Sequence, residues 1–253
     1  MATLSTGPVG IGDRIGSTNA TLVHATMRAD GLLLKPDVPA LTMEAVFVAA
    51  AARTIPGRLE LLDELTAAWS AHGPDRAWRW YYVLAANITQ AYSLAPADLG
   101  PALAATAYVA VDFFAIAGGG GGRGLAKPVN ASAALIVAPG NAQPSPPTGA
   151  VPVRYYILAP VLGPSGWVLI GEGGGKFVPM SGLRSRMLTV SPTGFSVEVE
   201  FDDDGAEQSL EMLVAAPAAP GDVAAVICTR PAAPNVSVTL TCEGSGAAGC
   251  TCE

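Results

Sequence analysis

From Trp78 onward the chain is a series of short apolar runs, and turn residues separate each run from the next. The runs are rich in β-branched and aromatic side chains and are bounded by clusters of Gly, Pro or Asp, which is typical of strands joined by turns. Residues 196–201 and 236–241 alternate strictly between polar and apolar side chains, as strands do when one face meets water. The sequence therefore predicts a mainly β fold, an antiparallel β-sandwich from about Trp78 to Cys242. The expected strands cover residues 78–86, 105–116, 132–137, 153–160, 166–171, 186–190, 195–201, 210–215, 223–229 and 236–242.

Helices are expected only before this region, ahead of Asp75. Residues 19–28 show a short helical pattern that Thr18 or Asn19 could cap. Residues 42–53 show a stronger one, with Thr42 as the expected N-cap and an Ala-rich body.

The composition argues against several classes of function. The chain has 253 residues, of which 50% are apolar and only 14% charged, so it can bury a sizeable core. The net charge is -7 and the 14 basic residues are scattered, so we expect no nucleic-acid partner. The apolar run at 45–52 is too short for a membrane helix and residues 1–10 lack a signal-peptide pattern, so no membrane partner and no export are expected. Sequons at Asn19, Asn87, Asn130 and Asn235 hint instead at a secretory route, and the localisation stays open.

The cysteines, Cys228, Cys242, Cys250 and Cys252, lie near the end of the chain. No second Cys pair or histidine accompanies Cys250 and Cys252, so the ligand set of a structural zinc site is incomplete. Ordinary cysteines or a disulfide are favoured over a metal, and no metal or cofactor is expected. Residues 244–253 lack apolar periodicity and are expected to form a Cys-containing tail.

A turn near the start of the chain carries the candidate site. An apolar strand over residues 1–12 would end in a Gly- and Pro-rich turn that holds Asp13 and Arg14. Active-site rims are built in this way at the C-terminal ends of barrel strands, and a carboxylate there could accept hydrogen bonds from sugar hydroxyls. Asp13 could equally form an Asx turn or a helix cap, and Arg14 a solvated charge.

Two blocks of the sequence carry a family resemblance. The first contains Thr6-Gly7-Pro8, Gly12-Asp13-Arg14-Ile15-Gly16, Asp30-Gly31-Leu32-Leu33-Leu34, Pro39 and Phe47, and the second contains residues 155–161 and 176–183. The first block resembles the last barrel strand and following helix of glycoside hydrolase family 36, in its raffinose synthase and alkaline α-galactosidase branch. The second block, in the same order along the chain, resembles the family's later strands. A Ser that precedes the Asp in that family is Gly12 here.

The resemblance implies a division of the chain. Residues 1–57 would be the remnant of the last β/α unit of a TIM-type barrel, residues 58–243 a β-sandwich domain, and 244–253 a tail. It also favours a strand over residues 65–70, where helix propensity is high, and leaves residues 58–63 as a turn or helix.

The same resemblance implies a function. The family's nucleophile and acid/base lie on earlier barrel strands that nothing here matches, so no catalytic residue is expected, and Asp13 and Arg14 are the expected substrate-binding residues. The chain would be the C-terminal accessory portion of a glycoside hydrolase or galactosyltransferase acting on α-galactosides, inactive alone, with the missing catalytic barrel as its packing partner. The alternative is a non-catalytic carbohydrate-binding or structural β-sandwich module.

Other motifs have plainer interpretations. Trp69, Trp78, Trp80 and Trp167 could stack on sugars, but both faces of the strand at 78–86 are apolar, which favours a buried core position for Trp78 or Trp80. The Gly-rich runs at 118–122 and 171–176 lack the rest of a phosphate-binding motif. Asp202-Asp203-Asp204-Gly205 lacks the later Glu of a calcium loop and is expected to be a solvated turn.

Overall fold

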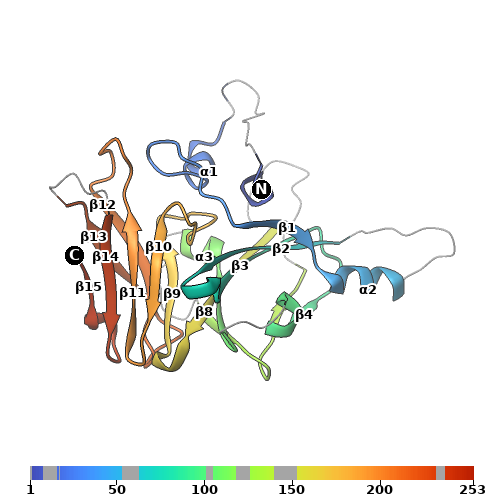
Figure 1. The fold of residues 1–253 in the computed structure, drawn as a ribbon. Helices are drawn as coiled ribbons and strands as arrows, with labels where there is room; N and C mark the ends of the chain where they lie inside the picture. The colour runs from blue at the N-terminus through green and yellow to red at the C-terminus, as the bar shows by residue number, and fades with distance from the viewer. Residues whose placement is uncertain are drawn as a thin grey trace.

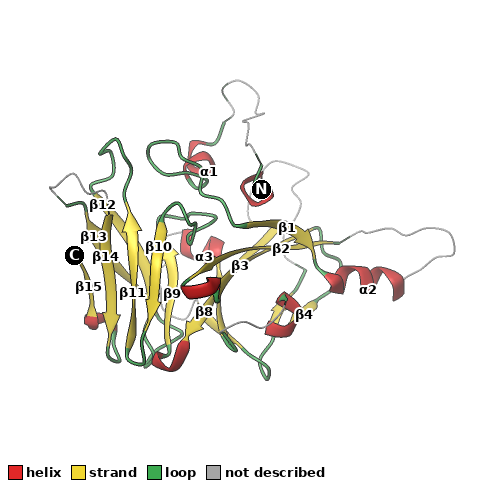
Figure 2. Cartoon of the chain, in the orientation of Figure 1, coloured by secondary structure: helices red, strands yellow, loops and turns green. Residues whose placement is uncertain are grey.

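A computed structural model describes residues 2–7, 16, 18–52, 63–100, 105–117, 126–139, 153–231 and 237–253. The fold is mainly β and its sheets are antiparallel (Figure 2). The strands are β1 (Val38–Thr42), β2 (Glu64–His72), β3 (Trp78–Ala86), β4 (Tyr92–Leu94), β5 (Tyr108–Asp112), β6 (Ala126–Val129), β7 (Leu135–Val137), β8 (Val153–Leu162), β9 (Trp167–Glu172), β10 (Ser185–Val190), β11 (Gly194–Glu200), β12 (Ser209–Ala215), β13 (Val223–Thr229), β14 (Ser237–Glu243) and β15 (Cys250–Cys252). The helices are α1 (Ala20–His24), α2 (Glu44–Ala52) and α3 (Phe113–Ala117), with 3-10 helices η1 (Ala2–Ser5), η2 (Pro74–Arg76), η3 (Pro96–Leu99), η4 (Gly163–Ser165) and η5 (Ala247–Gly249).

The main sheet has nine strands. Seven follow the order β1-β2-β3-β8-β9-β12-β13, while β5 pairs with β8 and β6 pairs with β5. A four-stranded sheet, β10-β11-β14-β15, lies beside the β12 and β13 end of the main sheet (Figure 1), and β4 and β7 form a separate ribbon. At the other end of the molecule α2 projects away from the sheets (Figure 1).

The two larger sheets share one hydrophobic core. On β11 the apolar side chains Phe195, Val197 and Val199 are buried, while the polar ones between them are only half-buried. The ring of Phe195 meets the ring of Trp167 on β9, with 6.1 Å between ring centroids. The alternation expected for residues 196–201 is therefore confirmed, and it turns one face of the smaller sheet toward the larger.

The expected core position of the tryptophans is also confirmed. Trp80 is fully buried and Trp78 is 8% exposed. The Trp80 indole Nε1 donates a hydrogen bond to the Leu169 carbonyl at 2.7 Å, so its one polar atom is satisfied inside the core.

The expected helix over residues 19–28 is shorter in the structure. It spans Ala20–His24, and Asn19 is its N-cap because its side chain accepts a hydrogen bond from the Leu22 N–H. Helix α2 begins at Glu44, two residues beyond the expected cap, because Thr42 is already paired with Thr66 in the sheet.

The expectation of no helix after Asp75 is wrong for one short element. The strand expected over 105–116 ends at Asp112, and α3 follows directly. The Asp112 carboxylate accepts a hydrogen bond from the Phe114 N–H at 3.0 Å, which favours a turn over an extended chain. The Phe113 ring then stacks on Phe177 at 4.8 Å between centroids.

The start of the chain also differs from expectation. The strand expected over residues 1–12 is not seen where the structure describes it, since Ala2–Ser5 form the 3-10 helix η1, which buries Leu4. Strand β1, which lies within residues 1–57, pairs antiparallel with β2, so it continues the main sheet rather than standing apart from it. The expected strand at 65–70 is confirmed within β2, whereas the segment expected as a turn or helix lies mostly outside the described residues.

The segment expected as a Cys-containing tail is ordered into the smaller sheet. Residues 250–252 form β15, which pairs with β14, and disulfides join Cys228 to Cys252 and Cys242 to Cys250. The disulfides stabilise this segment although it lacks apolar periodicity, because they lower the conformational entropy of the unfolded chain. They are also typical of oxidising compartments.

Candidate functional site

The residues that the sequence singled out, Asp13 and Arg14, lie outside the described part of the chain. Other candidates among the described residues include a cluster of charged side chains and a groove beside α2. The first was missed by sequence reasoning because its members come from separate loops.

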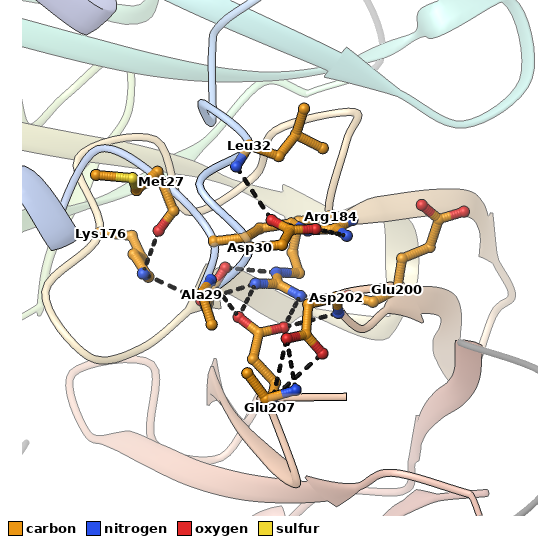
Figure 3. A network of polar contacts seen from close by, with 12 residues as sticks. Met27, Ala29, Asp30, Leu32, Lys176, Arg184, Glu200, Asp202 and Glu207 are labelled. Atoms are coloured by element: carbon orange, nitrogen blue, oxygen red, sulfur yellow. Dashed lines mark hydrogen bonds and ion pairs between the residues drawn. The ribbon is translucent and has the colours of Figure 1, made fainter. Parts of the chain in front are cut away.

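The charged cluster lies where the ends of β9, β11 and β13 meet the segment between α1 and β1 (Figure 3). Arg184, in the loop before β10, is at its centre and is fully buried. The Arg184 guanidinium binds the Glu207 carboxylate through two hydrogen bonds, of 2.7 and 2.8 Å, and donates to Glu172 at 2.7 Å. It also donates to the Glu200 backbone carbonyl. Such two-pronged pairing is the strongest form of ion pair that proteins make.

The position of Glu172 depends on a glycine. Gly171 has a φ of +117°, and a Cβ there would lie 2.6 Å from the Pro179 carbonyl oxygen. Only glycine allows this close approach, through which the Glu172 N–H reaches the same oxygen at 3.0 Å. The Gly-rich run at 171–176 therefore shapes the loop that places Glu172 and Lys176.

Acids and bases are matched throughout the cluster. Arg230 donates to Asp202 at 2.7 Å, Arg28 pairs with Asp30 at 2.5 Å, and the Lys176 amino group lies 3.8 Å from Glu172. Asp202 is fully buried and also accepts from the Ala206 and Glu207 N–H groups. The expectation of a solvated turn at 202–205 is therefore wrong for Asp202, while Asp203 does face water.

The cluster shifts the acidity of its carboxyl groups in opposite directions. Burial raises the pKa of Glu172 above its ordinary value, despite the nearby cations. Burial acts in the same direction on Glu207, but hydrogen bonds from Arg184 and from the Ala29 and Asp202 N–H groups outweigh it and lower the pKa of Glu207. The difference follows from the deeper burial of Glu172 and from the backbone N–H donors that Glu207 alone meets.

The cluster joins distant parts of the chain. Arg28 donates to the Leu183 carbonyl, Lys176 to the His24 and Met27 carbonyls, and the Ala29 N–H to Glu207 (Figure 3). These bonds fix the segment after α1 against the ends of the sheets. Since its buried acids all accept hydrogen bonds from protein donors, the cluster positions the segment after α1 and offers no unoccupied carboxylate for acid–base chemistry.

The second candidate is the groove beside α2, called here the α2 groove. Its volume is about 530 Å³, and it lies between one face of α2, the start of β4 and helix η3. Residues at helical spacing, including Glu44, Val48 and Ala52, form one wall. Gln90, Ser93 and Asp98 are among those that line the other side.

Two hydrogen-bonded acids shape the far wall of the α2 groove. The Asp98 carboxylate accepts from the Ala95 N–H at 2.7 Å, which holds it at the start of η3. The buried Asp63 carboxylate accepts from the Tyr92 hydroxyl at 2.6 Å and the Thr89 N–H at 2.8 Å, which fixes β4 against the main sheet. The polar groups that line the groove are acids, an amide and hydroxyls, which can form hydrogen bonds with the hydroxyl groups of a ligand.

Among the described residues no group of three or more His, Cys, Asp or Glu side chains could hold a metal ion. In the same residues no helix is long and apolar enough to cross a membrane.

Comparisons with protein-family models, with curated proteins and with solved structures find no match to this chain. The site must therefore be interpreted from its own geometry.

Proposed function

We propose that this chain is the C-terminal accessory portion of a glycoside hydrolase or galactosyltransferase acting on α-galactosides, and that it is inactive alone. In this proposal residues 1–57 are the remnant of the last barrel strand and helix, residues 58–243 form the sandwich domain, and residues 244–253 follow it as a Cys-containing segment. The observation that carries the proposal is the surface of α2.

Helix α2 is apolar on nearly all sides but poorly covered. Its sequence is EAVFVAAAA, and Val46 is its buried residue. Phe47 is 47% exposed and Val48 62%, and Leu41, just before the helix, is 63% exposed. We call Leu41, Phe47 and Val48 the α2 patch.

A partner of apolar character would stabilise this patch. Burying one such side chain contributes about 1.5–3 kcal/mol, so a helix that leaves several in water favours association. The last helix of a barrel packs against neighbouring strands and helices, which are the elements that the resemblance places in the missing part. The catalytic barrel is therefore the occupant that we propose for the α2 patch.

The described carboxylates support inactivity. Cleavage of a glycosidic bond needs two carboxyl groups about 5 Å apart for retention, or roughly 6.5–9.5 Å apart for inversion, on either side of an enclosed bond. Glu172, Asp202 and Glu207 are held by protein donors inside the charged cluster. Glu44 and Asp98 line the α2 groove, which is open to solvent along one side.

The purified chain is expected to release no nitrophenol from an aryl α-galactoside above the rate without protein. The variants Asp13→Asn and Asp98→Asn are the controls, the first in the segment that resembles a barrel rim and the second in the α2 groove. Turnover by the parent chain that either variant abolishes would show a complete enzyme, and the accessory function would then be wrong.

The isolated chain is expected to self-associate through the α2 patch. The double substitution Phe47→Glu and Val48→Glu should shift the sedimentation profile toward monomer, because it places charge in the apolar surface. The matched control is Met187→Glu with Ile227→Glu. These apolar side chains lie on β10 and β13 and are 78% and 57% exposed. A chain that is monomeric at all concentrations, or one that both pairs affect equally, would contradict a role for α2 in docking.

The α2 groove favours a second candidate, a non-catalytic carbohydrate-binding module. Glu44, Gln90, Ser93 and Asp98 offer hydrogen-bonding groups to a neutral sugar. The two functions differ in whether the isolated chain binds a sugar, since a binding module binds it without any partner. Saturable binding of galactose by the isolated chain, lost in Asp98→Asn, would favour the module.

A further inference from the structure

A second, smaller pocket lies between strands β5, β6 and β8 of the main sheet and strand β7. Its volume is about 290 Å³, and its polar lining residues are Asp112, Lys127, Arg154 and Tyr156. Ile136 and Ala138, in and after β7, form part of its apolar wall. None of these residues belongs to the charged cluster or to the α2 groove.

Strand register brings the polar residues to one face. Asp112 on β5 is directly opposite Tyr156 on β8, so their side chains point the same way. Arg154 is two residues before Tyr156 on the same strand and shares that face. Lys127 on β6 is opposite Ala110, which is two residues before Asp112, so it too shares the face.

The described residues that line the pocket carry more positive than negative charge. Arg154 and Asp112 form a loose ion pair, because the 3.9 Å between nitrogen and oxygen is longer than a direct hydrogen bond. Among the described residues no ion pair involves Lys127. Two cations against one carboxylate leave the lining with a single surplus positive charge.

Asp112 and Tyr156 supply the acceptor and donor groups of the pocket. One oxygen of Asp112 accepts from the Phe114 N–H, and the other faces Arg154. Burial, followed by the charge of Asp112, raises the pKa of the Tyr156 phenol above its ordinary value, so this group stays protonated and can donate.

We propose that this pocket binds a small hydroxylated carboxylate of monosaccharide size, that is, a sugar acid. Its carboxylate would lie between Lys127 and Arg154, and its hydroxyl groups would meet Asp112 and Tyr156. The surplus single positive charge matches a monoanion, whereas a phosphate dianion would lie close to Asp112 at an electrostatic cost. A volume of about 290 Å³ is below the range of drug-sized sites and suits a single sugar ring.

Titration of the full chain with glucuronate, followed by calorimetry at low ionic strength, tests the proposal. Glucuronate should bind saturably, with dissociation in the millimolar range and at least ten times more tightly than glucose or inorganic phosphate. The double variant Lys127→Gln and Arg154→Gln should lose at least tenfold in affinity for glucuronate.

The matched control is Arg76→Gln with Arg186→Gln, which removes the same charge from side chains that are 60% and 52% exposed elsewhere. It should bind glucuronate as the parent chain does, with both variants keeping the parent circular dichroism spectrum. Absence of saturable glucuronate binding, equal losses in the two double variants, or tighter binding of phosphate than of glucuronate would each overturn the proposal. It does not depend on the accessory function, because the α-galactoside assay and the α2 substitutions leave this pocket unchanged.

Discussion

Substitution of Arg184 by methionine is expected to lower the free energy of unfolding by about 3–5 kcal/mol. The guanidinium is fully buried, and its removal leaves the Glu172 and Glu207 carboxylates without their central partner. Buried carboxylates without a partner are costly, because the protein interior solvates charge poorly. Urea unfolding followed by tryptophan fluorescence measures the change.

Arg186→Met is the matched control for this substitution. Arg186 also pairs with a glutamate, since it lies 2.8 Å from Glu200, but its side chain is 52% exposed. Solvent screens such a pair, so the control should change the free energy of unfolding by less than about 1 kcal/mol. Equal effects of the two substitutions would show that the charged cluster does not hold the fold together.

The contrast between these two arginines shows what the sequence can predict. Arg184 and Arg186 are two residues apart and neither carries a local signal of burial. Arg184 is buried because loops from β9 and from between β11 and β12 bring Glu172 and Glu207 to it, and no window of sequence contains all three. The DDDG segment resembles an ordinary turn for the same reason, because Asp202 is buried by contacts with distant residues.

The sequence predicts the positions of the strands better than the residues of the candidate sites. The strand expected at 78–86 coincides with β3, and alternation gave the inward face of β11 correctly. Alternation is a local property, set by the period of the strand and by which side meets water. Pairing is not local, and so the sequence missed that β1 continues the main sheet and that β15 completes the smaller one.

The smaller pocket, lined by Asp112, Lys127, Arg154 and Tyr156, could have been found in part from the sequence. Arg154 and Tyr156 are two apart in an expected strand, which places both on one face. That Lys127 and Asp112 join them depends on the register of β5 with β6 and β8. Register follows from packing across the sheet, and a single sequence does not reveal it here.

Substitution of Trp80 by alanine is expected to destabilise the protein by about 3–5 kcal/mol, as removal of a large core aromatic does elsewhere. Trp80 is fully buried on β3, its Nε1 bonds to the Leu169 carbonyl, and its ring meets the edge of His72 at 5.2 Å between centroids. The variant loses the contacts of the indole and leaves the Leu169 carbonyl without this donor. Thermal and urea unfolding measure the change.

Trp69→Ala is the comparison that separates a core role from a sugar-stacking role. Trp69 on β2 is only half-buried, and the Arg79 guanidinium covers its ring at 4.2 Å. That contact contributes about 0.5–1 kcal/mol at an exposed site, so the substitution should cost clearly less than Trp80→Ala. A Trp80→Ala variant as stable as the Trp69→Ala variant would contradict the core role of Trp80, which is one of the largest fully buried side chains.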